Sequence, residues 1–391
     1  MLQAKMKNGQ LITLIHLSKK EVEEIKSRGE EFYCPECSQP VLVKSGIKVI
    51  SHFAHFAEKN CSLAENGEGA YHESGKIQLY NWLKKQRYEV QLEAFIPSIV
   101  QRPDILLTLY DKKIAIEYQC AQVPIEIIQN RNRGYLNAGI IPIWILGANK
   151  FIRISQNRFK LTPFLTQFLH QFSSSYPLLL LYFCPITSQF VKIQNIILTG
   201  SGQAFGSLSV KKLYHSAFPS LFSVDNYHEA LTYRYWKREK EAFRQNVRGK
   251  LYGEELAWHK WLYERGTHYE YLPSSIHLPV KDQYRMKLPP WNWQSRLLMD
   301  ILHPLSKGHV FSIHKAKYSL KKYYSPSVHF PLIHSHGEPI LQYLHLLERL
   351  GYLTSISDTH FRKQMIFPFY TNVEEAVKGD RRLLEVLESK I

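Results

Sequence analysis

The sequence has few cysteines and no apolar run long enough to cross a membrane, and each shortage narrows the class of protein. Five cysteines in 391 residues do not form a disulfide framework. The apolar run at residues 176–183 is far short of the roughly 20 residues that a membrane-spanning helix needs, and it predicts a buried strand instead. The N-terminal stretch MLQAKMKNGQLI lacks the continuous apolar core of a signal peptide. We therefore expect a cytoplasmic protein with reduced thiols and no membrane insertion.

Acidic residues are scarce relative to basic ones. The chain has 50 Lys and Arg against 34 Asp and Glu, so its formal net charge is +16. Such a charge indicates an anionic partner, most often nucleic acid and less often a membrane surface. With 45% hydrophobic and 13% aromatic residues the chain can bury a substantial core, and its length suits two or three domains.

Cysteine and histidine gather near the N-terminus. Cys34 and Cys37 have the spacing of a zinc knuckle, whose turn aims both thiolates at one tetrahedral ion. His52, His55 and Cys61 follow, which gives five candidate ligands for a four-coordinate site. We predict a structural zinc ion bound by Cys34, Cys37, His55 and Cys61. His52 is then expected to lie near the site or in the core without binding the ion. The alternative is a turn with buried free thiols beside an ordinary aromatic strand.

The periodicity of apolar residues predicts an α/β core behind this segment. It also predicts an earlier helix at residues 19–28, which Ser18 caps, and a mainly helical region from residue 226 onward. The expected elements of the core are a helix at 71–85, strands at 104–109 and 113–119 joined by a tight turn, a helix at 125–137 and an apolar strand at 140–146.

Three carboxylates are predicted to converge in this core. Asp104 begins one strand and Glu117 lies late in the next, so a tight antiparallel pair makes them neighbours. Gln119 shares a face with Glu117 because strand side chains alternate, and Glu73 lies near the start of the preceding helix. Carboxylate oxygens are the ligands that Mg²⁺ prefers, and such ions promote phosphodiester hydrolysis. We predict a catalytic centre of Glu73, Asp104, Glu117 and Gln119 that binds Mg²⁺ or Mn²⁺; solvated acids at strand ends are the alternative.

Two short motifs resemble the signature of the PD-(D/E)xK nuclease fold, namely Arg102-Pro103-Asp104 and Glu117-Tyr118-Gln119. Gln119 departs from that signature, in which Lys is commonest at the third position. A glutamine can hydrogen-bond but carries no charge to stabilise the reaction. The departure puts the cleavage activity in question.

A larger set of motifs resembles the competence protein CoiA family of transformable bacteria over about residues 1–150. The resemblance implies a nuclease-like protein that acts on incoming single-stranded DNA upstream of RecA-dependent recombination. Its implied partners are single-stranded DNA, RecA and other competence proteins. The motifs that carry it are Cys34-Pro-Glu-Cys37, His52-Phe-Ala-His55, Tyr71-His72-Glu73, Arg102-Pro103-Asp104, Glu117-Tyr118-Gln119, Arg131 with Tyr135, and Ile143-Trp144-Ile145-Leu146.

We therefore expect three consecutive parts. Residues 1–66 form the zinc-binding segment, residues 67–150 the nuclease-like α/β domain, and residues 151–391 a mixed and then mainly helical region that binds DNA or a partner. The competing functions are a Mg²⁺-dependent deoxyribonuclease, a non-catalytic recombination mediator that binds DNA and assists RecA, and a zinc-stabilised scaffold.

Basic side chains near aromatic ones are candidates for DNA contact. Arg131 and Tyr135 lie one helical turn apart and suit a phosphate clamp with a stacking base, or equally a helix that packs on the sheet. In residues 233–244, basic residues alternate with aromatic ones. A helical core with solvated basic residues explains this pattern as well. The predicted DNA-contacting residues are Lys76, Arg102, Arg131, Tyr135, Arg234, Lys237, Arg238 and Arg244.

Overall fold

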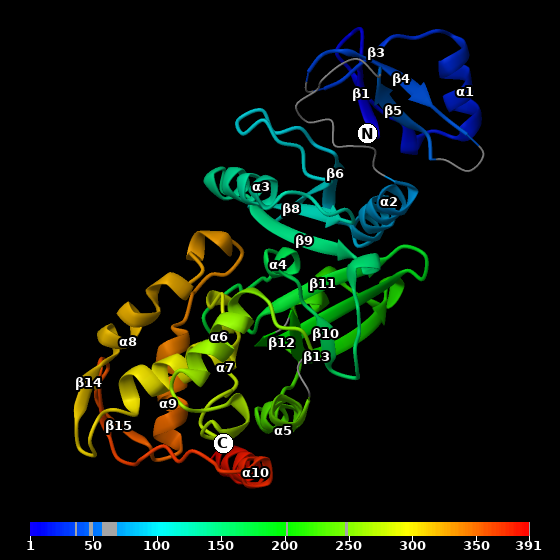
Figure 1. Cartoon of the computed structure of the whole chain (residues 1–391). Helices are drawn as coiled ribbons and strands as arrows, with labels where there is room; N and C mark the ends of the chain where they lie inside the picture. Colours follow the sequence, from blue (N-terminus) through cyan, green and yellow to red (C-terminus); the bar gives the residue numbers. More distant parts are fainter. Residues whose placement is uncertain (36, 47–49, 57–68, 201, 247–248, 391) are drawn as a thin grey trace. The chain divides into compact units, whose positions relative to one another are not determined.

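The protein is described by a computed structural model that covers residues 1–391 except 36, 47–49, 57–68, 201, 247–248 and 391 (Figure 1). The chain divides into two compact units of alternating segments. Unit 1 comprises Met1–Ile152, Leu179–Ile193 and Leu208–Ser223, and unit 2 comprises Arg153–Leu178, Gln194–Ser207 and Val224–Ile391. The domain boundaries predicted at residues 66 and 150 stay predictions.

The N-terminal part of unit 1 is a small antiparallel sheet with one helix. The strand order is β2-β1-β3-β4-β5. Helix α1 begins where predicted, because the Ser18 side chain accepts a hydrogen bond from the Glu21 amide and the Glu21 carboxylate accepts one from the Ser18 amide. The elements are β1 (Gln3–Met6), β2 (Leu11–Thr13), η1 (Leu14–His16), α1 (Lys19–Ser27), β3 (Phe32–Tyr33), β4 (Pro40–Lys44) and β5 (His52–His55).

An eight-stranded mixed sheet follows, in the order β10-β13-β12-β11-β9-β8-β7-β6. Strands β6, β7 and β8 are antiparallel, while β8 pairs parallel with β9 and β9 with β11. These elements confirm the predicted α/β class and the predicted strand pair. The elements are α2 (Ala70–Lys85), β6 (Glu89–Leu92), β7 (Ile105–Leu109), β8 (Lys112–Gln119), α3 (Ile125–Asn137), β9 (Ile141–Gly147), η2 (Ala148–Lys150), β10 (Arg158–Lys160), α4 (Pro163–Thr166), β11 (Leu179–Cys184), β12 (Gln189–Gly200) and β13 (Gln203–Lys212).

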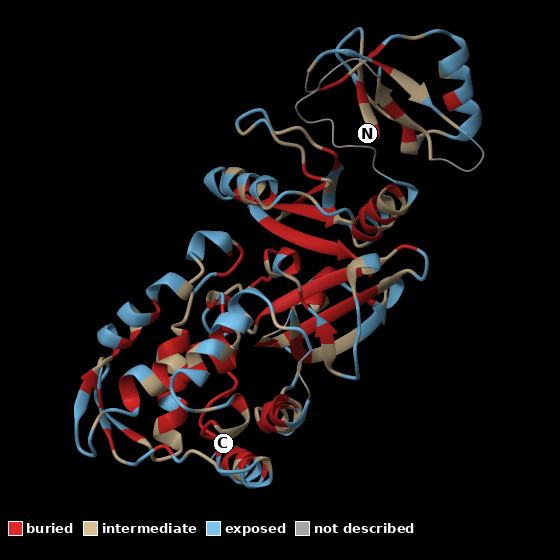
Figure 2. Ribbon diagram, viewed as in Figure 1, coloured by how far each residue is buried: buried red, intermediate tan, exposed pale blue. Residues whose placement is uncertain are grey.

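Strand β8 is covered on both faces, and Figure 2 shows it and β9 buried along most of their length. Tyr118 points toward α2, where the absence of a Cβ at Gly75 leaves room for its ring. The neighbouring Glu117 points the other way and meets Arg131 and Tyr135 of α3. Because adjacent strand residues face opposite sides, α2 and α3 lie on opposite faces of the sheet.

Strands β12 and β13 are long strands in a part of the chain for which the sequence predicted only a mixed region. They span Gln189–Gly200 and Gln203–Lys212. Gly200 and Gly202 both have positive φ, which glycine adopts without steric cost and which lets the chain reverse between the two strands. Strands β12 and β13 are neighbours in the eight-stranded sheet.

The C-terminal part of unit 2 is mainly helical, as predicted, but also holds a small sheet of order β14-β16-β15. Trp236, Trp258 and Trp293 are fully buried in its core. None of the helices in the described part of the chain has the length and apolar character of a membrane-spanning segment. The elements of this part are α5 (Ala230–Gln245), α6 (Gly253–Tyr263), η5 (Tyr269–Tyr271), η6 (Gln283–Arg285), α7 (Pro290–Leu297), η7 (Leu298–Leu302), β14 (Val310–Ser312), α8 (Ile313–Leu320), η8 (Lys321–Tyr323), η9 (Ser327–His329), α9 (Pro339–Arg349), β15 (Leu353–Ser357), β16 (His360–Lys363) and α10 (Val373–Ser389); before them, η3 (Leu213–His215) and η4 (Phe218–Phe222) belong to unit 1.

Candidate metal centre and acidic site

The N-terminal sheet brings three of the predicted zinc ligands together. Cys34 follows β3 and His55 ends β5, and both strands pair with the start of β4. The ligand atoms of Cys34, Cys37 and His55 all lie within 4.8 Å of one another. The Cys37 Sγ lies 3.3 Å from the His55 Nε2. Two sulfurs and one imidazole nitrogen are a donor set that suits zinc.

The fourth predicted ligand, Cys61, lies outside the described residues. His52 is not part of the group: its Nδ1 lies 2.9 Å from the Ile50 carbonyl oxygen and 3.9 Å from the Glu73 carboxylate. The group therefore contains His55 rather than His52. It is a possible metal-binding site, and the identity of the ion stays a prediction.

The acidic residues of the α/β core lie at the open end of the β7–β8 hairpin. Ile105 pairs with Ile116 across the two strands, so Asp104 and Glu117 occupy the next positions along the pair. The Asp104 carboxylate also accepts a hydrogen bond from the Tyr118 amide at 2.8 Å. This placement follows from the tight turn at residues 110–112, as the sequence predicted.

Glu117 is 4% exposed and faces helix α3. Its Oε1 accepts hydrogen bonds from the Arg131 guanidinium and from the Tyr135 hydroxyl. Burial raises the pKa of Glu117 to about 7; the positive charge of Arg131 opposes the rise, and the negative charge of Asp104 adds to it. Arg131 and Tyr135 were predicted to contact DNA, and here both bind this carboxylate.

Asp104 faces helix α2 instead. The His72 Nε2 lies 3.4 Å from one of its carboxylate oxygens, and the Lys76 Nζ lies 3.6 Å from the other. Lys76 is fully buried. Its ammonium group is therefore stabilised by the Asp104 carboxylate and not by water.

Glu93 is part of this site and was not identified from the sequence. It follows β6, is 3% exposed and has a left-handed φ of 51°. Its carboxylate accepts hydrogen bonds from the Lys76 Nζ and from the Leu2 amide, each at 2.6 Å, and lies 3.8 Å from Arg102. A positive φ at a residue other than glycine is a strained conformation that is often found at functional sites. No sequence pattern identifies Glu93 as such a residue.

The two remaining predicted residues lie at the margins. Gln119 donates a hydrogen bond to the Ala121 carbonyl at 2.8 Å, so its amide is held by its own loop. Glu73, in the first turn of α2, is 3% exposed and lies 3.9 Å from the His52 Nδ1.

The acids do not form a tight ligand set like the Cys/His group. Within the described residues, Cys34, Cys37 and His55 are the one group of three metal-ligating side chains whose ligand atoms all lie within 4.8 Å of one another. Three basic side chains, Lys76, Arg102 and Arg131, lie among the acids. The predicted Mg²⁺ site of Glu73, Asp104 and Glu117 stays a prediction.

The predicted DNA-contacting residues of α5 are mostly engaged by helix α10. Arg234 and Lys237 pair with Glu388 and Glu385 at 2.8 and 3.2 Å. Arg244 is 1% exposed and binds both carboxylate oxygens of Asp380. Arg244 is buried and is therefore not accessible to DNA. Arg238 is exposed, and its contact with DNA stays a prediction.

Three family models match the chain in succession. The model of the N-terminal domain of competence protein CoiA matches residues 14–64, that of its nuclease-like domain residues 68–226, and that of its C-terminal domain residues 231–377. The chain is 32% identical to the competence protein CoiA of Bacillus subtilis (strain 168) over 275 residues, which is 70% of this chain and 73% of that protein. No solved structure matches the chain.

Proposed function

Because the chain belongs to the competence protein CoiA family, we propose that its nuclease-like domain hydrolyses phosphodiester bonds in single-stranded DNA, upstream of RecA-dependent recombination. The reacting site of the proposal is the hairpin end that carries Asp104 and Glu117. The observation that supports it most is the burial of Glu117 beside Asp104, which raises the pKa of Glu117 to about 7. Buried acids with perturbed pKa values are candidates for functional sites.

The residues around the hairpin end suit this role. When bound there, Mg²⁺ or Mn²⁺ would offset charge on the phosphate and lower the pKa of the attacking water. Asp104 and Glu117 would hold the ion, with Glu73 and Gln119 at the margin. Lys76 keeps a positive charge beside Asp104, and Arg131 orients Glu117 through two nitrogen contacts.

The proposal is tested with labelled single-stranded DNA and added Mg²⁺ or Mn²⁺. Asp104→Asn and Glu117→Gln should each lower cleavage about 100-fold, since each removes a carboxylate that would hold the metal ion. Glu89→Gln is the matched control, because Glu89 is exposed at the start of β6. Cleavage at the wild-type rate by both site variants would overturn the proposal.

A second function is favoured by one specific observation. The Glu117 carboxylate is already bound by Arg131 and Tyr135, so the protein itself supplies the positive charge that a metal ion would bring. This arrangement suits a non-catalytic mediator that binds single-stranded DNA and assists RecA. Wild-type protein that binds DNA and promotes RecA loading, yet shows no metal-dependent cleavage, would select this function over the first.

A further inference from the structure

A stretch without acids runs through the C-terminal part of unit 2. Residues 301–337 contain five lysines and no Asp or Glu. The stretch includes helix α8 and the short helix η8. Lys315, Tyr318 and Lys322 are all exposed, with Tyr318 at 82%. Their spacing of three and four residues places them on one face, so this face is basic and carries an aromatic ring.

Beside this face, positive charges alternate with aromatic rings. The Arg265 and Arg296 guanidinium groups lie 4.2 and 4.9 Å from the Trp261 ring. Arg296 also lies 5.5 Å from the Tyr323 ring, and the Lys322 Nζ lies 4.8 Å from that ring. We call these five residues the cation–aromatic ladder. Cation–π contacts hold flat rings and charges in fixed positions at the surface.

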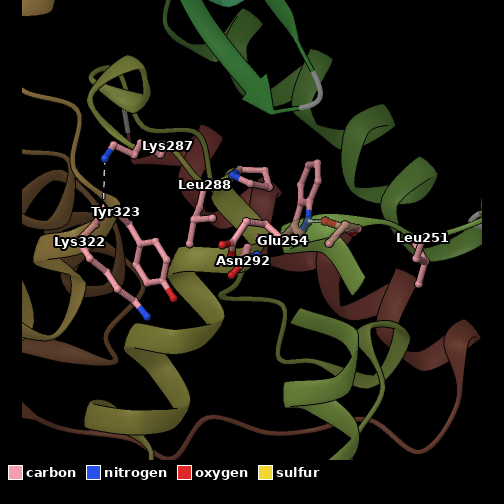
Figure 3. A pocket seen from close by; sticks show the side chains of 10 residues that line it. Leu251, Glu254, Lys287, Leu288, Asn292, Lys322 and Tyr323 are labelled. Atoms are coloured by element: carbon pink, nitrogen blue, oxygen red, sulfur yellow. Dashed lines mark hydrogen bonds between the residues drawn. The ribbon is translucent and has the colours of Figure 1, made fainter. Parts of the chain in front are cut away.

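The ladder borders a cavity of about 660 Å³. Lys287, Lys322 and Tyr323 line one side of it together, and Leu251 lies on the other (Figure 3). The Lys287 ammonium donates to the Lys322 carbonyl at 3.4 Å, which holds the two lysines close together. Trp291 adds a second aromatic side chain to the lining.

We propose that the cation–aromatic ladder and this cavity form a binding site for single-stranded DNA, separate from the acidic site of the nuclease-like domain. Lys287 and Lys322 would neutralise phosphates, and the Tyr323 ring would stack on a base. The exposed lysines of residues 301–337 favour a polyanion, and the rings favour one whose bases are unpaired, because every base offers a π face that a duplex keeps inside its own stack.

Acidic side chains inside and near the cavity would orient the strand. Glu254 and Glu255 also line the cavity, and Glu255 accepts a hydrogen bond from the Trp291 indole at 3.4 Å. Asp300 pairs with Arg265 at 3.0 Å. Because carboxylates repel phosphates, the strand would place its phosphates along Lys287 and Lys322 and turn its bases toward Tyr323.

This inference does not depend on cleavage at Asp104 and Glu117. The experiment therefore uses full-length protein that carries Asp104→Asn, without added Mg²⁺, and measures binding of a fluorescent oligo(dT) by anisotropy over a salt series. Lys287→Ala with Lys322→Ala should weaken binding at least about tenfold and lower the magnitude of the salt slope by about 1.4, since each phosphate contact on a single strand contributes about 0.7. A loss of cleavage alone would bear on the proposed function and leave this site intact.

The matched control is Lys378→Ala with Arg382→Ala, which removes the same charge from exposed positions of α10 in the same unit. Tyr323→Leu keeps an apolar side chain but removes the ring, and it should weaken binding about tenfold with an unchanged salt slope. Thermal unfolding checks that each variant folds. Equal weakening by both double variants, or full binding by Lys287→Ala with Lys322→Ala or by Tyr323→Leu, would overturn the proposal.

Discussion

Ionisable side chains inside this protein are stabilised in different ways. Glu117 is bound by a guanidinium and a hydroxyl group, whereas Lys76 is held between Glu93 and Asp104. His170 instead stays neutral, because burial lowers its pKa to about 4. A buried charge is unfavourable unless it is paired. Glu117 and Lys76 are therefore paired, whereas His170 is uncharged.

His170 makes the stability of the protein depend on pH. Its pKa in the unfolded chain is about 6.5, so between pH 6.5 and 4 the unfolded state binds a proton that the folded state excludes. Stability present above pH 6.5 is therefore lost as the pH falls. The loss reaches about 3 kcal/mol. Urea unfolding at pH 7 and pH 4.5 should show a smaller difference for His170→Gln than for wild type.

The other titrating groups are common to both proteins, so the comparison isolates His170. An equal pH dependence in wild type and His170→Gln would contradict the prediction.

At the scale of secondary-structure elements, paired charges join helix α5 to helix α10. Asp380 lies at the centre, where it is 1% exposed and pairs with Lys240 and Arg244. At the surface, Arg234 pairs with Glu388 and Lys237 with Glu385. The basic face of α5 therefore contributes to helix packing, and DNA contact by its exposed residues stays a prediction.

The buried and exposed pairs should differ in their effect on stability. Asp380→Ala leaves two cations buried without their partner and should lower the free energy of unfolding by about 3–5 kcal/mol. Glu388→Ala removes an exposed pair and should cost about 1 kcal/mol or less. Urea unfolding followed by circular dichroism measures both, and equal effects would show that the central pair does not hold the helices together.

Helix α2 approaches the sheet closely at Gly75. A Cβ at this position would lie 2.0 Å from the Tyr118 ring, whose hydroxyl donates to the Phe183 carbonyl at 3.0 Å. Gly75→Ala should therefore destabilise the protein by about 1–3 kcal/mol, although alanine is the better helix former.

Gly134→Ala in α3 is the matched control, because the added Cβ meets only the flexible end of Gln101. It should be milder in the same thermal unfolding measurement. A Gly75 variant as stable as the Gly134 variant would mean that Tyr118 moves aside without cost.

At the scale of the whole molecule, we expect the small N-terminal sheet to depend on its Cys/His group. Among the described residues, its buried hydrophobic cluster has seven members, Ala4, Leu14, Val22, Phe32, Cys34, Val41 and Phe53. A segment with so little buried apolar surface needs a metal or another staple to stay folded.

Metal analysis should find about one equivalent of zinc in purified protein. Cys37→Ser should lose it and expose the N-terminal segment to limited proteolysis, while the rest of the chain resists cleavage. Cys184→Ser is the control, since Cys184 ends β11 and is outside the group. The prediction would be contradicted if the wild-type protein contained no bound metal or if the Cys37 variant kept its zinc.

Local signals in the sequence determined the elements of the α/β core. Ser18 caps the N-terminal helix α1 as predicted, and in the core the turn at residues 110–112 sets the register that brings Asp104 beside Glu117. Cysteine spacing likewise predicted the group of Cys34, Cys37 and His55. These features depend on residues that are close in sequence or joined by short turns. Their geometry can therefore be predicted from the spacing of the residues.

The tertiary structure decided which charges face which partners. Glu93 joins the acidic site, Arg131 binds Glu117, and Asp380 takes up Arg244 through contacts between residues far apart in sequence. The cation–aromatic ladder likewise draws its members from separate elements, α6, α7 and η8. Charge is visible in a sequence, but whether a side chain is buried, paired or exposed depends on which segments pack beside it.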